Sequence, residues 1–167
     1  VLIFLVAYLL MNLGAFAVIV AVGKRIGSDN IEDYRGLMKR APLYAGALVV
    51  FFASLAGIPP TAGFMGKLFV FGAAVKVGLM GHPELIVLAV LGVVNSVISV
   101  YYYFNVVRLM FFAPAAVDHK IRGTVAINTA VVATLALTLA FLIFAKPVSS
   151  VASHAVYISK TVLISGR

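Results

Sequence analysis

The sequence contains no cysteine, and only five of its 167 residues are acidic. Without cysteine the chain has no disulfides, thiol chemistry or cysteine-bound iron–sulfur cluster. Its three histidines have no second histidine or carboxylate at ligand spacing, so we predict no metal site. A G-x-G-x-x-G fingerprint and a P-loop are also absent, because Leu68 follows Lys67 where a P-loop needs Ser or Thr. We therefore expect no cofactor to bind this chain.

Charge is scarce as well, since 63% of the residues are hydrophobic, 11% are charged and the mean hydropathy is +1.14. A soluble domain carries roughly 25% charged residues. The formal net charge of +8 does not indicate a nucleic-acid partner, because basic residues on so apolar a chain are typical of cytoplasmic loops. The composition predicts an integral membrane protein whose main environment is the lipid bilayer.

The chain begins inside a hydrophobic run at Val1, with no methionine and no basic segment before it. A signal peptide has a basic segment ahead of its apolar run. We therefore expect the sequence to be the C-terminal piece of a longer protein.

Hydrophobic runs long enough to cross a bilayer predict the fold class. We expect an all-α polytopic membrane protein with about four transmembrane crossings in residues 1–146, followed by a C-terminal tail over 147–167. The crossings are predicted over 1–22, 42–80 (broken at 57–63), 85–107 and 124–145.

The second run is interrupted by Gly57, Pro59, Pro60 and Gly63. Two prolines remove two backbone donors, so a continuous helix is not expected here. The run is either two crossings or one discontinuous helix.

Charge distinguishes these two alternatives. The loop 23–41 carries five Lys/Arg and the segment 108–123 carries three, whereas the turn 81–84 carries none. Both basic loops lie in the cytoplasm only if 42–80 makes a single net crossing. We therefore expect one discontinuous helix, and a tail on the outer face.

Lys67 is the candidate proton carrier, because it lies in an apolar run one turn beyond the break. A lysine in the bilayer core is costly, and an ammonium in an apolar medium releases its proton more readily than one in water. The alternative is a lysine that snorkels to an interface. Apolar residues continue beyond Lys67 and favour the functional interpretation, whereas Lys76, near the end of the run, is expected to snorkel.

Polar residues in two other runs are candidate supports of a proton path. Asn95, Ser99 and Tyr102 recur at helical spacing and lie near one face. They can hold a chain of waters, or they can hydrogen-bond neighbouring helices together. Asn12 follows Tyr8 by one turn, and a helix-packing role is the simpler interpretation there.

Several strings resemble the antiporter-like family of subunit N of proton-pumping NADH–quinone oxidoreductase (respiratory complex I). They occur in the family's order and spacing, and the resemblance extends to about residue 112. The strings are Tyr8–Ala17, Ile31–Leu37, Ser54–Lys67 and the polar stretch from Asn95 to Arg108.

The resemblance implies a role and a location. The family has two inverted repeats of five helices in a fourteen-helix subunit, and this chain would hold about helices eleven to fourteen. By position Lys67 matches the lysine on the second broken helix, which is expected to complete the outer half of a proton channel. The resemblance implies a multi-pass protein of the bacterial inner membrane.

The same resemblance implies partners and cofactors elsewhere. The neighbours would be other membrane-arm subunits, including antiporter-like ones. NADH, FMN, iron–sulfur clusters and quinone are expected in other subunits, so the chain would belong to a translocating enzyme without holding its redox site. Two alternatives remain open: a subunit of a related sodium/proton antiporter or membrane-bound hydrogenase, and a structural subunit in which Lys67 is merely paired.

Overall fold

The computed structural model describes residues 2–28, 30–115, 120–121 and 123–141. Every regular element in these residues is a helix, so the all-α prediction is confirmed. The elements are α1 (Leu2–Ile26), the short 3-10 helix η1 (Ile31–Tyr34), α2 (Leu37–Arg40), α3 (Pro42–Ala56), α4 (Ala62–Gly78), α5 (Pro83–Phe112) and a further helix, Val125–Phe141.

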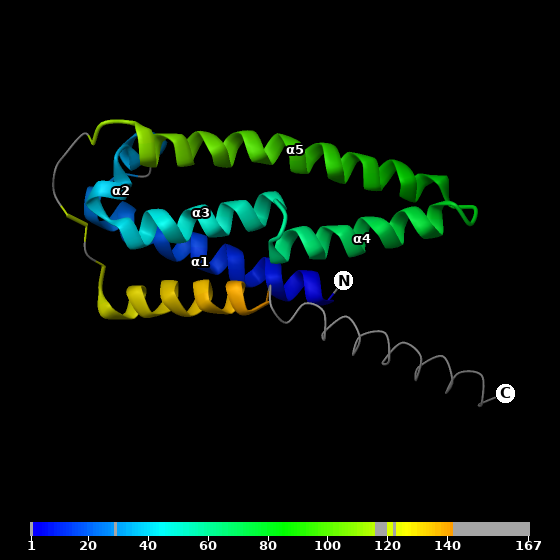
Figure 1. The fold of residues 1–167 in the computed structure, drawn as a ribbon, viewed down its shortest axis with the longest axis horizontal. Helices are drawn as coiled ribbons and strands as arrows, with labels where there is room; N and C mark the ends of the chain where they lie inside the picture. Colours follow the sequence, from blue (N-terminus) through cyan, green and yellow to red (C-terminus); the bar gives the residue numbers. More distant parts are fainter. Residues whose placement is uncertain (1, 29, 116–119, 122, 142–167) are drawn as a thin grey trace, which may run out of the picture.

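Two of these helices are long and apolar enough to cross a membrane alone, Phe4–Ile26 and Pro83–Phe112. The 15 residues of α3 span only about 23 Å, less than a bilayer core. Figure 1 shows α3 and α4 following one another in the same direction along the long axis, and α5 packs against both. The two helices therefore form one interrupted path beside the single 30-residue helix α5.

The helices extend beyond the predicted apolar runs. The first helix continues through Lys24 and Arg25 to Ile26, because basic residues are favoured at a helix C-terminus. The helix α5 begins at Pro83, a residue tolerated in a first turn, and ends at Phe112. Residues 142–145 of the last predicted crossing and the tail 147–167 lie outside the described residues.

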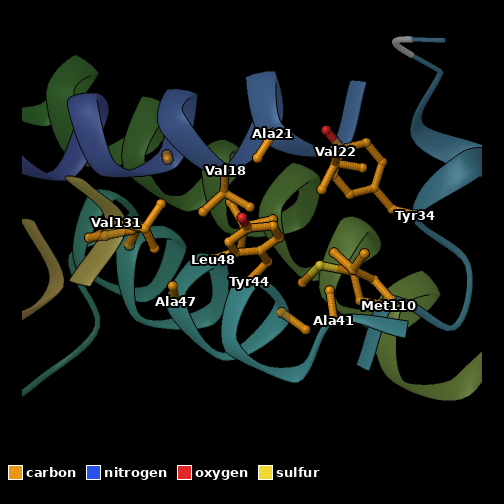
Figure 2. Close-up of a cluster of buried hydrophobic side chains, with 14 of the residues drawn as sticks. Val18, Ala21, Val22, Tyr34, Ala41, Tyr44, Ala47, Leu48, Met110 and Val131 are labelled. Atoms are coloured by element: carbon orange, nitrogen blue, oxygen red, sulfur yellow. The ribbon is translucent and has the colours of Figure 1, made fainter. Parts of the chain in front are cut away.

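The main core lies where α1, α3 and α5 meet (Figure 2). Val18 and Val22 of α1 face Leu48 of α3 and Met110 of α5, and all four are fully buried. Val131, from the last described helix, is also buried in this cluster. This core fixes the position of α3, and hence of the C-terminal end of α3 at the break.

One end of the bundle carries the polar loop of η1 and α2. The Gly36 N–H donates to the carbonyl oxygen of Leu109 in α5, at 3.1 Å. Gly36 has a φ of +63°, which L side chains rarely adopt. The opposite end is the turn between α4 and α5, at Gly81 and His82.

Candidate functional site

The break begins with a Schellman motif at the end of α3. Gly57 adopts a φ of +84°, and its N–H donates to the carbonyl oxygen of Ser54 at 3.1 Å. The next N–H, of Ile58, donates to the carbonyl oxygen of Ala53 at 3.0 Å. This motif satisfies two of the four carbonyls that the last turn of a helix leaves unpaired.

Lys67 satisfies the other two. Its Nζ donates to the carbonyl oxygen of Leu55 at 2.8 Å and to that of Ala56 at 3.1 Å. The Lys67 side chain is half-buried and passes close to Gly57, where an added Cβ would lie 3.1 Å from Lys67 Cδ. Lys67 of α4 therefore caps the C-terminus of α3, where the helix dipole is negative.

The first turn of α4 packs closely against the end of α3. The Thr61 hydroxyl accepts from the Phe64 N–H at 3.3 Å, and the buried Ser54 hydroxyl accepts from the Gly63 N–H at 3.2 Å. A Cβ on Gly63 would overlap the carbonyl oxygen of Ser54. Gly63 thus permits the approach that brings Lys67 to α3, and Pro59 and Pro60 lie between the two helices.

Two cavities meet at Lys67. One, of about 280 Å³, contains polar groups from α1 and α5 and is lined in part by Tyr8, Asn95, Ser99 and Tyr103. The other, of about 460 Å³, lies beside the break and is mostly apolar, with Ile58, Pro59, Val97 and Val100 among its lining residues. Lys67, Phe71 and Ser96 line both cavities.

The polar residues of α5 that line the smaller cavity differ from the predicted stripe at one position. Asn95 and Ser99 line the smaller cavity together with Lys67, as the helical spacing suggested. Tyr102 does not line it and is 62% exposed, whereas Tyr103 does and stacks on Phe52 of α3 with the ring centroids 4.8 Å apart. Helical spacing alone does not identify Tyr103 as the tyrosine that lines the cavity, because it does not show which side of α5 faces α3.

Hydrogen bonding in the stripe is largely local. The Ser96 hydroxyl donates to the carbonyl oxygen of Gly92 at 2.8 Å, and the Ser99 hydroxyl donates to that of Ser96 at 2.7 Å. Both hydroxyl oxygens keep lone pairs for a water in the cavity.

The remaining predicted residues lie apart from the lysine. The Asn12 amide donates to the backbone oxygen of Tyr8 at 2.8 Å, so it bonds within its own helix. Lys76 is exposed in the last turn of α4. In the described part of the chain, no group of three His, Asp or Glu side chains gathers as a metal would require.

Lys67 can bond the same two carbonyls in both its charged and its neutral form. A charged Lys67 has three N–H donors, of which two bond the carbonyls of Leu55 and Ala56. A neutral amine still has two N–H donors for these carbonyls, and its lone pair is then free to accept a proton from the cavity. Proton exchange therefore does not require the cap to break.

The family model described as "NADH:quinone oxidoreductase/Mrp antiporter, TM" matches residues 1–99, more than half of the sequence. The chain belongs to this family. With its apolar helices, membership establishes an all-α polytopic membrane protein, as the composition predicted.

Two curated relatives of the chain are subunits of bacterial NADH-quinone oxidoreductases. It is 39% identical over 97% of its length to NADH-quinone oxidoreductase subunit N 2 of Chloroherpeton thalassium, of which it covers 31%. It is 41% identical over 89% of its length to NADH-quinone oxidoreductase subunit N of Heliobacterium modesticaldum, of which it covers 30%. The chain thus spans about a third of the length of the curated relatives that it matches.

A solved structure agrees with these relatives. The family chain is similar to a chain of respiratory complex I from Thermus thermophilus with bound aureothin, at a TM-score of 0.65 and 31% identity. The match covers 86% of this chain and 33% of that one. The predicted resemblance to subunit N is confirmed at the level of sequence and fold.

Proposed function

We propose that the chain forms part of a subunit N of NADH–quinone oxidoreductase that translocates protons across the membrane. Lys67 is the proton carrier in this proposal. The observation that carries it is the position of the Lys67 Nζ, bonded to two carbonyls at a helix break and lining two cavities at once.

The smaller cavity is the proposed path to and from Lys67. Asn95, Ser99, Tyr8 and Tyr103 offer hydroxyl and amide groups that can order water beside the amine. Asn95 and Tyr8 are exposed in this chain, although polar groups facing lipid would be costly. We infer that the open side of the cavity faces further helices of the subunit.

The negative end of the α3 dipole keeps a charged Lys67 tolerable in an apolar environment. We propose that changes in the charge and water of the smaller cavity move the proton on and off Lys67, which a permanently charged cap would not allow.

The proposed topology has four crossings, with α3 and α4 counted as one. The basic residues of α1 and α2 lie at the end of the bundle opposite the Gly81–His82 turn. The positive-inside rule then assigns that end to the cytoplasm and the tail to the outer face. The proposed partners are other membrane-arm subunits, including antiporter-like ones, and NADH, FMN, iron–sulfur clusters and quinone would be bound by other subunits, with no redox site in this chain.

A second function is suggested by the family description, which includes Mrp antiporters. In that case the same lysine would serve cation/proton exchange without NADH oxidation. A third possibility, a scaffold lysine, is suggested by the two carbonyl bonds of Lys67 themselves.

Replacement of Lys67 by methionine in the full-length subunit tests the proposal. We expect normal assembly, with NADH-driven proton translocation and the coupled quinone reductase activity both lowered. Loss of sodium/proton exchange with unchanged NADH-driven pumping would favour the antiporter function. Loss of assembly with normal pumping per intact complex would favour the scaffold.

A further inference from the structure

A third cavity lies at the basic end of the bundle, far along α3 from the break. It measures about 330 Å³ and is formed by the end of α2, the start of α3 and four residues later in the chain, Lys120, Ile121, Gly123 and Asn128. Its lining residues are Arg40, Ala41, Pro42, Leu43, Tyr44, Lys120, Ile121, Gly123 and Asn128. The set contains two cations and no acidic side chain.

Arg40 is the unusual residue of this cavity, because its charged side chain is only 8% exposed. One guanidinium nitrogen, Nη1, donates to the carbonyl oxygen of Asp33 at 3.0 Å. The Nε is fully buried and has no hydrogen-bond partner among the described residues. Burying a guanidinium that keeps its charge is costly, and a negative charge in the adjoining cavity would offset part of that cost.

Other donors converge on the same cavity. Helix α3 begins here without a side-chain cap, so the N–H groups of Leu43 and Tyr44 have no intrahelical partner. The positive end of the helix dipole adds to the charge of Arg40. Lys120 is exposed at the rim and supplies a second cation.

The cavity wall is held by hydrogen bonds between distant segments. The Tyr44 hydroxyl donates to Oδ1 of Asn128 at 2.5 Å, and the Ile121 N–H donates to the carbonyl oxygen of Arg40 at 3.1 Å. Gly123 packs against Tyr44 and Asn128, and a Cβ there would overlap the Tyr44 hydroxyl. The site is therefore formed before any ligand arrives.

We propose that this cavity binds the phosphate of an anionic phospholipid headgroup. Arginine, a lysine and free N–H groups are the donors that a phosphodiester accepts. A lipid is favoured over a soluble phosphate because the cavity lies where the apolar run of α3 begins, at the level of the headgroups. Leu43, in the cavity wall, is 44% exposed and offers an apolar surface beside the phosphate for the start of an acyl chain. Basic pockets between helices at a membrane interface bind such headgroups in general.

Photo-crosslinking in nanodiscs tests this proposal in the intact membrane complex that contains the chain. The nanodiscs consist of phosphatidylcholine with a trace of photoactivatable phosphatidylglycerol, and crosslinks to residues 40–44 are quantified by mass spectrometry. We expect crosslinking that an excess of unlabelled phosphatidylglycerol abolishes and that photoactivatable phosphatidylcholine does not produce.

Variants separate the cavity from general surface charge. Lys120→Glu is expected to lower the crosslink yield about tenfold, because it replaces a charge-assisted hydrogen bond by repulsion. Lys39→Glu makes the same charge change at an exposed neighbour that does not line the cavity, and it should change the yield less than about twofold. Arg40→Gln should act like Lys120→Glu wherever the complex assembles.

Two results would overturn the proposal. Equal loss of crosslinking in Lys39→Glu and Lys120→Glu would mean that the lipid responds only to the overall charge of the loop. Displacement of the lipid by inorganic phosphate as effectively as by unlabelled phosphatidylglycerol would assign the cavity to a soluble anion. Neither result would bear on proton translocation, because the cavity does not include Lys67.

Discussion

The Nζ of Lys67 lies 2.8 Å from the carbonyl oxygen of Leu55, so the residue proposed to carry protons also completes the end of the preceding helix. The Schellman motif at Gly57 leaves that carbonyl, and the one of Ala56, to the lysine. The Lys67 side chain thus has a structural role, capping α3, and a proposed functional role, proton transfer. Substitutions at Lys67 and at its neighbours separate the two roles.

The approach of α4 to α3 should depend on Gly63. A methyl group there would overlap the Ser54 carbonyl oxygen, so Gly63→Ala should destabilise the subunit by about 2 kcal/mol, as overpacking does. Gly46, within α3, has no atom within 4 Å of an added Cβ, and Gly46→Ala should be neutral or slightly stabilising. Thermal unfolding of the detergent-solubilised complex measures both. Equal stability of the two variants would show that the contact is unimportant.

The break itself should be needed for transport more than for assembly. Replacing Pro59 and Pro60 together by alanine restores two backbone donors and lets helical structure extend from α3 toward α4. The carbonyls of Leu55 and Ala56 would then be used within the helix, and Lys67 would lose both acceptors. We expect proton pumping to fall while the yield of assembled complex stays near normal. Unchanged pumping in the assembled variant would refute this role of the prolines.

Adjacent tyrosines of α5 provide a matched pair. Tyr103→Phe keeps the stacking on Phe52 and removes the hydroxyl of a residue that lines the cavity beside Lys67. Proton pumping should fall severalfold, which is less than the roughly 10²–10⁴-fold contribution of a direct general acid–base contact, because Tyr103 would act only by ordering water. Tyr102→Phe removes a hydroxyl from an exposed ring outside the cavity and should leave pumping near normal. A larger loss of pumping in Tyr102→Phe than in Tyr103→Phe would favour the polar stripe that the sequence predicted, which includes Tyr102.

Topology can be measured by single cysteines, since the chain contains none. Cysteines at Ser28 and Thr124 should react with a membrane-impermeant maleimide from the cytoplasmic side, and one at His82 from the outside. Inverted and right-side-out vesicles distinguish the two sides. If positions 28 and 124 react from opposite faces, α3 and α4 are two separate crossings.

The sequence predicts structure well where a residue type constrains the backbone directly, and the consecutive prolines with their flanking glycines predicted the break between α3 and α4. It also drew attention to Lys67, because a charge in an apolar run is rare. The capping of α3 by Lys67 could not be predicted, because it requires knowing that the start of α4 lies close enough to the end of α3 for the Lys67 side chain to reach the carbonyls of Leu55 and Ala56. That approach depends on the packing of Gly63 against Ser54.

Helix faces were harder to assign than helix positions. Tyr102 lies closer than Tyr103 to the Asn95–Ser99 line by helical spacing, yet the packing of α5 on Phe52 turns Tyr103 toward the cavity. Arg40 was missed as a site residue because its burial depends on the packing of α2 against α3 and α5 and on its hydrogen bond to the carbonyl oxygen of Asp33 in η1. Local sequence carries no signal for such contacts.

The central claim is that Lys67 exchanges protons and is more than a fixed positive cap, and Lys67→Arg tests it most directly. A guanidinium can donate to the carbonyls of Leu55 and Ala56 as the ammonium does, but it does not lose its proton in proteins. The measurement is NADH-driven proton pumping in reconstituted vesicles, normalised to intact complex, for wild type, Lys67→Arg and Lys67→Met. We expect normal assembly and strongly reduced pumping for Lys67→Arg, with a similar loss for Lys67→Met. Full pumping by Lys67→Arg would contradict proton exchange at this residue, and would leave Lys67 as a fixed charge that caps α3.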